Sequence, residues 1–254
     1  MSRIFLAFYI LLNLLISPWA SAKALQVAII IDDIGYRKSD LQALDLPGNI
    51  SYAILPRTPY GRSLALQAKA KSNDVILHIP MEARNGKKLG PGALTSQMNE
   101  ANIRQQLSDA FAEVPFALGI NNHMGSKLTE LYEPMAWTMK FLKERNLIFI
   151  DSMTSRASQA EQVAKNFGVP SLHRHIFLDN QLQHSYISGQ FSKLILAAKK
   201  HQPVIAIAHP HPETISSLLR LLPLLAENNI ELVPISKLFI AQETDSTKKI
   251  NADE

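Results

Sequence analysis

Five hydrophobic runs of this sequence are each followed directly by residues that can bind a metal or transfer a proton. In chain order these residues are Asp32-Asp33, His78, Asn121-Asn122-His123, Asp151 and His209-Pro210-His211. Any one of them could be a helix cap or a hydrogen-bonded structural residue. Carboxylates and imidazoles are also the common ligands of zinc and the common proton-transfer groups of enzymes. Five such strand ends together therefore indicate a catalytic site.

Two acids and several imidazoles favour a divalent metal. One carboxylate and two neutral histidines leave a tetrahedral zinc ion with an open position, which is the geometry of catalytic zinc sites. Such an ion lowers the pKa of water, and a second carboxylate can take up the proton. Adjacent Asp32 and Asp33 suit this division of labour. Consecutive strand residues point to opposite faces, but at a strand end both can reach a crevice.

The runs that carry these residues are typical of strands buried on both faces, because most are rich in Val and Ile without polar alternation. The predicted strands are Leu25–Ile31, Ile50–Leu55, Val75–Leu77, Phe116–Ile120, Leu147–Ile150, Val204–Ala208 and Ile230–Ile235. The helical segments between them are Gly61–Ser72, Asn99–Glu113, Glu133–Arg145, Ser158–Phe167, Gln190–Lys200 and Pro212–Asn228. Asn99, Ser158 and Thr214 are the expected helix caps.

Repeated strand–helix alternation predicts either a doubly wound sheet or a closed (β/α) barrel. In both folds, ligand-binding groups converge where the strands end, on loops over a rigid scaffold. No Gly-x-Gly-x-x-Gly pattern follows any predicted strand, which argues against a dinucleotide-binding fold.

Composition sets further bounds on the class of protein. The chain has 254 residues, 46% of them hydrophobic, and contains no cysteine. The hydrophobic fraction excludes a disordered chain, and stability has to come from core packing rather than disulfides. The formal net charge of +4 is spread along the sequence without a basic block, so we expect no nucleic-acid partner.

The two ends of the chain differ from the rest. Residues 1–22 combine Arg3, an apolar run and the small residues Ala20-Ser21-Ala22, a pattern that predicts a cleaved signal peptide. The protein is then secreted or periplasmic and has no membrane span after cleavage; an uncleaved anchor is the alternative. Residues 23–241 are expected to form one domain, and residues 242–254 a disordered tail.

The motifs, taken in order, resemble those of the divergent polysaccharide deacetylase family, an offshoot of the nodulation-factor-type carbohydrate deacetylases. They read AIIIDDIGY, LHIPMEA, GINNHMGSKLT, FIDSMTS, FLDN and IAIAHPHPET and extend from Leu25 to Leu238. The resemblance implies a distorted (β/α) barrel of about seven parallel strands. It further implies a metal-dependent hydrolase that removes N-acetyl groups from a cell-wall or envelope polysaccharide, with zinc as the expected divalent metal.

The resemblance also implies a metal site. In the better-known deacetylases the first Asp of a paired motif is the base and the second is a metal ligand, roles that fall here on Asp32 and Asp33. Two histidines four residues apart complete that site. Here His78 is followed by Glu82 at the second position, so either Glu82 or His123 completes it, and His123 is the better substitute.

The remaining implied roles concern proton transfer and substrate. His209 matches the histidine that protonates the leaving amine, and Asp151 matches the acid that tunes it. The expected substrate-binding residues are Asn121, Asn122, Asp179 and His211, with Arg174 as a further site candidate.

Two departures from the family pattern keep other functions open. Glu82 replaces a histidine, and an arginine-containing substrate loop is missing from the segment of His123. The alternative is a glycan-binding or regulatory envelope protein of the same fold with weak or no turnover. A glycosidase that pairs Asp32 or Asp33 with Asp151 is a third possibility, which the distance between the carboxylates would test.

Overall fold

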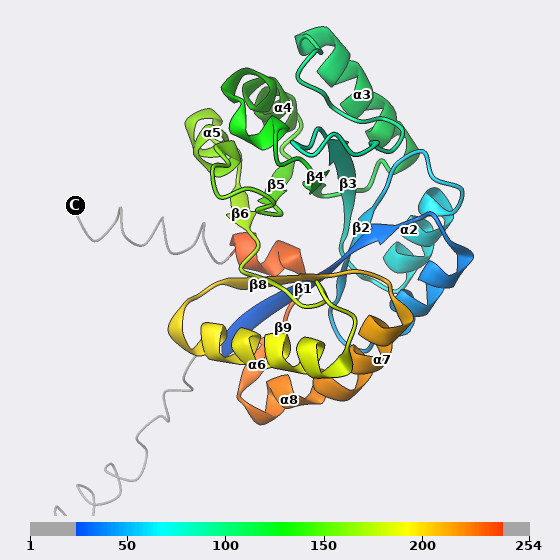
Figure 1. Ribbon diagram of the computed structural model, residues 1–254, viewed down its shortest axis with the longest axis vertical. Helices are drawn as coiled ribbons and strands as arrows, with labels where there is room; N and C mark the ends of the chain where they lie inside the picture. Colours follow the sequence, from blue (N-terminus) through cyan, green and yellow to red (C-terminus); the bar gives the residue numbers. More distant parts are fainter. Residues whose placement is uncertain (1–23, 241–254) are drawn as a thin grey trace, which may run out of the picture.

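The structure, a computed structural model, describes residues 24–240. In that part of the chain nine parallel strands form one curved sheet, and the helices lie around its outside (Figure 1). The strands are β1 (Leu25–Ile34), β2 (Ser51–Ile54), β3 (Val75–Met81), β4 (Gly119–Met124), β5 (Ile148–Asp151), β6 (Ser171–His173), β7 (Ile176–Phe177), β8 (Val204–Ala208) and β9 (Ile230–Leu232). The predicted α/β class, a distorted barrel of parallel strands, is confirmed. Strands β6 and β7 were not among the seven predicted, because three and two residues are too few to show a hydrophobic period.

The helices follow the predicted segments with shifted ends, except that the predicted segment Pro212–Asn228 divides into two helices. They are α2 (Gly61–Ala70), α3 (Glu100–Glu113), α4 (Tyr132–Glu144), α5 (Ala160–Phe167), α6 (His184–Lys200), α7 (Pro212–Leu221) and α8 (Pro223–Glu227), with the 3₁₀ turns η1 (Lys38–Asp45) and η2 (Leu128–Glu130). Asn99 caps α3 as predicted, since its side chain accepts the N–H of Asn102. Ser158 and Thr214 are not N-caps, because α5 begins after Gln159 and α7 begins after His211.

The chain itself bridges the gap between the two edges of the sheet. The strand order is β6-β5-β4-β3-β2-β1-β8-β7, with β9 beside the first residues of β1, so the consecutive strands β6 and β7 lie at opposite edges. Between them, the N–H of Arg174 donates to the carbonyl of Asp151, and the N–H of His175 donates to the carbonyl of Ile205, each at 2.9 Å. The barrel is therefore completed by two backbone hydrogen bonds in place of a strand ladder.

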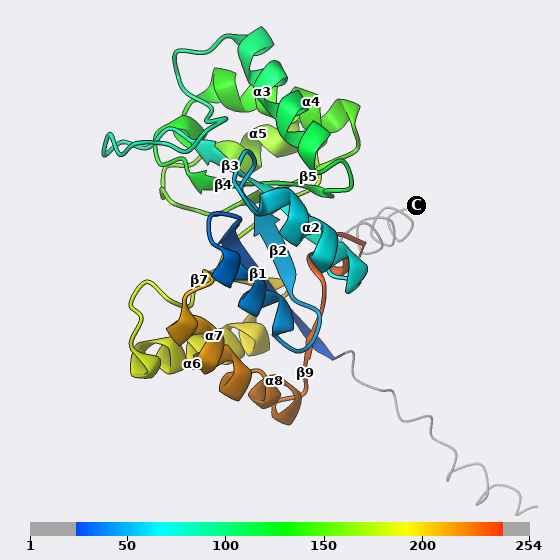
Figure 2. The same ribbon diagram turned by 90° about the vertical axis from the view of Figure 1, so that its right-hand side faces the viewer.

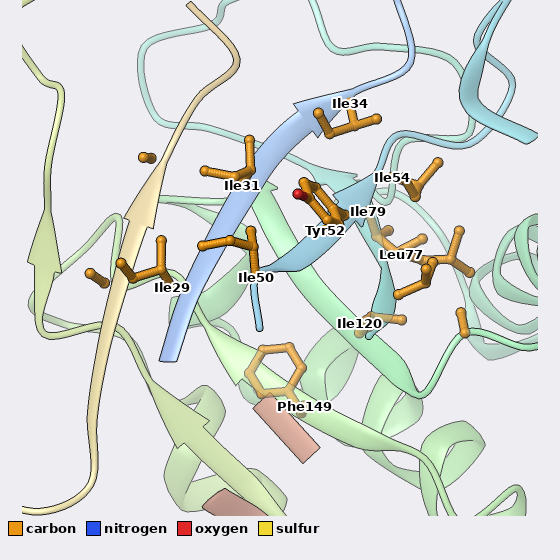
Figure 3. Packing of buried hydrophobic residues seen from close by; sticks show 14 of the residues in the cluster. Ile29, Ile31, Ile34, Ile50, Tyr52, Ile54, Leu77, Ile79, Ile120 and Phe149 are labelled. Carbon is orange, nitrogen blue, oxygen red and sulfur yellow. The ribbon is translucent and has the colours of Figure 1, made fainter. Parts of the chain in front are cut away.

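Side chains of successive strand residues alternate between two cores. The outer core, which includes Ile29 and Ile31, packs against the helices (Figure 3). The inner core consists of Ala28, Ile30, Ala53, Ile76, Ile150, Leu172, Ile205, Ile207, Val233, Ile235, Leu238 and Phe239. Because strand side chains repeat with a period of two, a residue two positions beyond an inner one also points inward. This parity determines which polar strand-end residues meet.

Several predictions concern residues that the structure does not describe. The signal peptide at residues 1–22 and the disordered tail at residues 242–254 lie outside the described range and stay predictions, as do the domain limits 23–241. Among the described helices, none combines the length and the hydropathy needed to span a membrane.

Candidate active site

The inward-facing side of the barrel becomes polar where the strands end. Asp32, His78 and His209 each lie two positions after an inner-core residue, which is Ile30, Ile76 and Ile207 respectively. Asp179 lies two positions after Phe177, a partly buried residue that packs against the inner core. On β4, Asn121 is the register partner of His78, and His123 follows it with the same parity. Strand alternation thus brings acids and imidazoles from β1, β3, β4, β8 and the end of β7 to one place.

Asp33 joins this group through an irregularity in β1. Between Ile31 and Ile34 the pairing with β2 changes register, since three steps along β1 correspond to two along β2. Asp33 adopts the left-handed conformation with φ of 60°, which Asp tolerates better than most residues do. Such a bulge re-aims side chains at the end of a strand. It is the reason that both adjacent aspartates, Asp32 and Asp33, reach the site.

Three potential metal ligands form a compact triangle. Asp33 Oδ1 lies 2.8 Å from His123 Nδ1 and 3.2 Å from His78 Nε2, and the two ring nitrogens are 3.1 Å apart. In the described chain this is the one group of three or more such side chains whose donor atoms converge closely enough to hold an ion. Ligands at about 2.0–2.2 Å from a tetrahedral zinc ion would be separated by slightly more than these distances.

The charge and the hydrogen bonding of the Asp33 carboxylate are those expected of a metal ligand. Its Oδ1 is buried and has no well-aligned hydrogen-bond donor, although two imidazoles lie beside it. Burial alone would raise the pKa of Asp33, but the proximity of His123 and His78 outweighs burial and holds that pKa well below its usual range. The carboxylate is therefore ionised and has a lone pair free. One carboxylate and two imidazoles suit zinc or a similar divalent ion.

Asn121 connects a predicted ligand to the predicted base. Its Oδ1 lies 2.7 Å from His78 Nδ1, and its Nδ2 donates to Asp32 Oδ1 at 2.8 Å. Since the amide oxygen can only accept, His78 carries its proton on Nδ1 and leaves Nε2 free for a metal. Burial raises the pKa of Asp32, against the charges of His78 and His209 and the hydrogen bond from Asn121. A raised pKa suits a general base.

His209 is held by Asp179. His209 Nδ1 lies 3.0 Å from Asp179 Oδ1, while Asp179 Oδ2 accepts the backbone N–H of His209 at 2.7 Å and the hydroxyl of Thr214 at 2.8 Å. Burial would lower the pKa of His209, but Asp179, with Asp32 and Asp33 nearby, outweighs it and raises the pKa to about 9. The imidazolium therefore persists at neutral pH with its Nε2 proton available, as a general acid requires.

A pocket of about 240 Å³ opens beside these groups. It is lined by Asp33, Tyr36, Arg37, Asp40, Leu55, His123, His209, Pro210 and His211. Asp33 and His123 of the ligand triangle thus face the same cavity as the proposed acid His209. His211 lies on its wall, where the sequence placed a substrate contact. Tyr36 and Arg37 were not anticipated, because they lie in a loop without periodicity.

Glu82 is not part of the metal group. Its carboxylate pairs with Lys127 and accepts the backbone N–H of Ser96 at 2.6 Å. Burial would raise its pKa, but these two partners hold it at about 2. Of the two residues expected to complete the metal site, the structure brings His123, and not Glu82, beside Asp33 and His78. Which of the two binds a metal stays a prediction.

Strand parity also corrects the expected partner of His209. Ile150 faces inward, so Asp151 points outward, where it accepts the hydroxyl of Ser158 at 2.5 Å and the N–H of Met153 at 2.7 Å. The contact with His209 that was expected of Asp151 is made by Asp179. The sequence named Asp179 as a substrate-binding residue, but its role beside His209 was missed because the two-residue strand β7 shows no hydrophobic period.

Three side chains predicted to touch substrate are buried behind the site instead. Asn121 and Asp179 serve the hydrogen bonds described above, and Asn122 binds the carbonyl of Met124 and the N–H of Ser152. The guanidinium of Arg174 binds the carbonyls of Ser152 and Met153. Asn122 and Arg174 thus hold the loops after β4 and β5 rather than a ligand.

The fold and this site define a class: a parallel (β/α) barrel with an Asp-His-His candidate metal centre at the carboxyl ends of its strands. A family model described as divergent polysaccharide deacetylase matches residues 29–239, and the chain belongs to that family. The chain is 39% identical to an uncharacterized protein of Haemophilus influenzae, over 84% of this chain and 76% of the relative. It is 37% identical to the uncharacterized protein YibQ of Escherichia coli, over 95% and 75% respectively.

Solved structures share the fold. An uncharacterized protein from Agrobacterium tumefaciens has a TM-score of 0.82 at 22% identity, covering 87% of this chain and 92% of that one. A CE4 family pseudoenzyme from Bacillus anthracis has a TM-score of 0.54 at 12% identity, covering 85% and 66%. The peptidoglycan deacetylase PdaC from Bacillus subtilis has a TM-score of 0.51 at 11% identity, covering 91% and 98%.

Proposed function

We propose that this protein is a metal-dependent hydrolase that removes N-acetyl groups from a glycan of the cell envelope. The observation that carries the proposal is the triangle of Asp33 Oδ1, His78 Nε2 and His123 Nδ1, with sides of 2.8–3.2 Å. Two of its residues, Asp33 and His123, line a pocket that His209 lines as well. Membership of the divergent polysaccharide deacetylase family supports the substrate class.

The ligand triangle would hold the ion, with zinc expected from the donor set. When bound, a divalent ion supplies Lewis acidity, which polarises the acetyl carbonyl and makes water a stronger acid. Asp33, ionised and lacking a hydrogen-bond donor, supplies the negative charge of the site. Asn121 keeps His78 in the tautomer that presents Nε2.

Proton transfer would be divided between two residues. Asp32 Oδ2, which is not used by Asn121 and lies 3.6 Å from His78 Nε2, takes the proton from the attacking water. His209 Nε2 then gives a proton to the nitrogen of the leaving amine, since its Nδ1 is engaged by Asp179. The proton balance closes when Asp32 releases its proton to solvent and His209 takes one up, after the acetate and the amine have left.

We place this activity outside the cytoplasm. The support comes from the sequence of residues 1–22, which has the charge, apolar run and small residues of a cleaved signal peptide. Sequencing the amino terminus of the protein recovered from the envelope fraction tests this proposal. A start at Lys23 supports cleavage and export, whereas Met1 on membrane-bound protein would indicate an anchor.

A glycan-binding protein of the same fold is the second candidate. The observation that favours it is Glu82, which takes the place of a family histidine and pairs with Lys127. The Bacillus anthracis neighbour, a pseudoenzyme, shares the fold as well. The intact triangle with His123 favours the hydrolase.

Paired variants distinguish the two candidates. Asp32→Asn and His209→Ala should keep the metal while lowering acetate release from an N-acetylated glycan by about 10²- to 10⁴-fold. Asp33→Asn and His123→Ala should lose the metal, because each removes a ligand. If the metal-loaded parent protein binds glycan but releases no acetate from any N-acetylated cell-wall polymer, the hydrolase proposal is wrong and the binding protein is preferred.

A further inference from the structure

One wall of the pocket is not used by the proposed hydrolysis. Tyr36 and Arg37, in the loop after β1, form part of this wall together with Pro210 and His211. Tyr36 is 48% exposed, and Arg37 is exposed as well. The catalytic wall orients an acetamide and its leaving amine, so this outer wall faces the rest of the sugar.

Arg37 is a cation without a counter-charge in the described chain. It forms no ion pair with any acidic side chain of residues 24–240. The acid closest in sequence that lines the pocket, Asp40, is only 2% exposed, and its Oδ2 accepts the backbone N–H groups of Gly35 and Arg37 at 3.0 Å each. The Asp40 carboxylate is thus committed to the loop backbone, and the Arg37 guanidinium is free to bind a ligand.

Three lysines extend this positive charge. Lys38 follows Arg37, and Lys87 and Lys88 belong to the loop after β3; all three are exposed and, in the described chain, without an ion pair. That loop reaches the pocket wall, since a Cβ on Gly90 would lie 2.9 Å from Tyr36 Oη. Figure 2 shows the loop projecting on the side where β3 and β4 end. We call Arg37, Lys38, Lys87 and Lys88 the basic rim.

Acidic side chains on the same side of the barrel do not cancel this charge. Glu82 and Glu130 are paired with Lys127 and Arg84. Glu133 and Glu213 lie in the first turns of α4 and α7, where a carboxylate interacts favourably with the helix dipole. None of these acids, which all lie in the described chain, forms an ion pair with the basic rim, and the ionised Asp33 in the pocket itself would face the proposed metal ion.

We propose that the basic rim binds an anionic substituent, a carboxylate or a phosphate, on the glycan whose acetamide enters the pocket. This inference rests on the proposed function and deepens it by naming the substrate class. A volume of about 240 Å³ lies below the roughly 300–1,000 Å³ of common ligand pockets, so it fits about one sugar residue. The anionic group then lies on that sugar or its neighbour, within reach of Arg37, whose planar guanidinium can donate two hydrogen bonds to a carboxylate or phosphate.

The test compares three matched sugars in equilibrium binding to the mature protein, both zinc-loaded and chelator-treated. N-acetylglucosamine is neutral, N-acetylmuramic acid adds a carboxylate, and N-acetylglucosamine 6-phosphate adds a phosphate. At low ionic strength we expect one anionic sugar to bind about tenfold more tightly than the neutral sugar. A gain in affinity of this size is what one hydrogen bond to a charged group provides. The preferred anion identifies the substituent, and added salt should weaken the preference.

Arg37→Gln should abolish the preference, and Lys87→Gln with Lys88→Gln should reduce it. Lys193→Gln, which removes an exposed lysine of α6, is the matched control and should leave it unchanged. Far-ultraviolet circular dichroism checks that each variant is folded.

Equal affinities for the neutral and anionic sugars overturn the inference. It is also overturned if a short DNA duplex, added at the same total concentration of negative charge, displaces the anionic sugar, because the rim would then bind any polyanion. The proposed function is judged separately, by acetate release from N-acetylated glycans that include neutral chitotetraose and anionic cell-wall polymers. Acetate release with equal sugar affinities keeps the function and rejects the basic rim. If the protein prefers anionic sugars through Arg37 but releases no acetate from any N-acetylated glycan, the basic rim remains a glycan-binding site and the hydrolase proposal is rejected.

Discussion

Replacing Asp179 by Asn is expected to shift the pH dependence of the protein. Asp179 is the principal reason that the pKa of His209 lies at about 9, whereas burial acts in the opposite direction. An ordinary histidine titrates near 6.5, so the pKa is raised by about 2.5 units, which corresponds to roughly 3 kcal/mol in favour of the imidazolium. Asp32 and Asp33 contribute part of this, so we expect the variant pKa to fall by about 1–2 units.

The sign of the effect follows from the role of His209 as an acid. A general acid is active in its protonated form, so activity falls as pH rises through its pKa. In Asp179→Asn the alkaline limb of kcat/KM should move to lower pH, with a loss at pH 8 of about twofold for a one-unit shift and about tenfold for a two-unit shift. An NMR titration of the His209 imidazole reports the same pKa without turnover. Thr214→Val, which removes one hydrogen bond to Asp179 but no charge, is the control and should shift the limb far less.

The reasoning is refuted if folded, metal-loaded Asp179→Asn keeps both the alkaline limb and the imidazole pKa of the parent protein. Asp179 would then not be the group that holds His209 protonated. If the imidazole pKa falls but the alkaline limb stays, His209 is not the acid that the pH profile reports.

Three further predictions test the parts around this pair. Asn121→Leu should weaken metal affinity by about 10- to 100-fold, because His78 loses the partner that fixes its tautomer; a metal affinity equal to that of the parent protein would contradict this role. Glu82→Ala should leave metal content unchanged, whereas His123→Ala should abolish it; metal loss in Glu82→Ala would restore Glu82 as a ligand. Ile30→Ala should lower the free energy of unfolding by about 2–5 kcal/mol through a cavity in the inner core, measured by urea denaturation. Leu66→Ala on the exposed side of α2 should change it by less than about 0.5 kcal/mol, and equal effects would show that the inner core is misassigned.

The sequence predicts the barrel and much of the site because both depend on local patterns. Runs such as Val204–Ala208 are apolar throughout, which is how strands covered on both faces read. A polar residue directly after such a run lies at the carboxyl edge of the sheet. Asp33, His78 and His123 were predicted as ligands on the family motifs, and the structure brings them together.

The errors arise where strand ends were placed too early. The sequence ended the fourth strand at Ile120, whereas β4 continues to Met124. Asn121 and Asn122 therefore lie inside a strand and face opposite ways, one toward His78 and one toward Ser152. Asp151 fails as the partner of His209 for the same reason of parity, since Ile150 already faces inward.

Other features depend on tertiary contacts that no local pattern encodes. The bulge at Asp33 is visible only in the register between β1 and β2. The strands β6 and β7 form because they pair with the neighbouring strands β5 and β8. They are so short that the intrinsic strand propensity of their residues has little influence. The contact between the loop after β3 and Tyr36 joins segments more than 50 residues apart in the sequence.

The most direct test of the central claim is anomalous diffraction, at the zinc absorption edge, from crystals of the zinc-loaded protein. We expect one strong peak bonded at about 2.0–2.2 Å to a carboxylate oxygen of Asp33, to Nε2 of His78 and to Nδ1 of His123. The peak should face the pocket that His209 lines. A protein that binds zinc with no peak among these three side chains, or with His78 and His123 bound to different ions, would contradict the account.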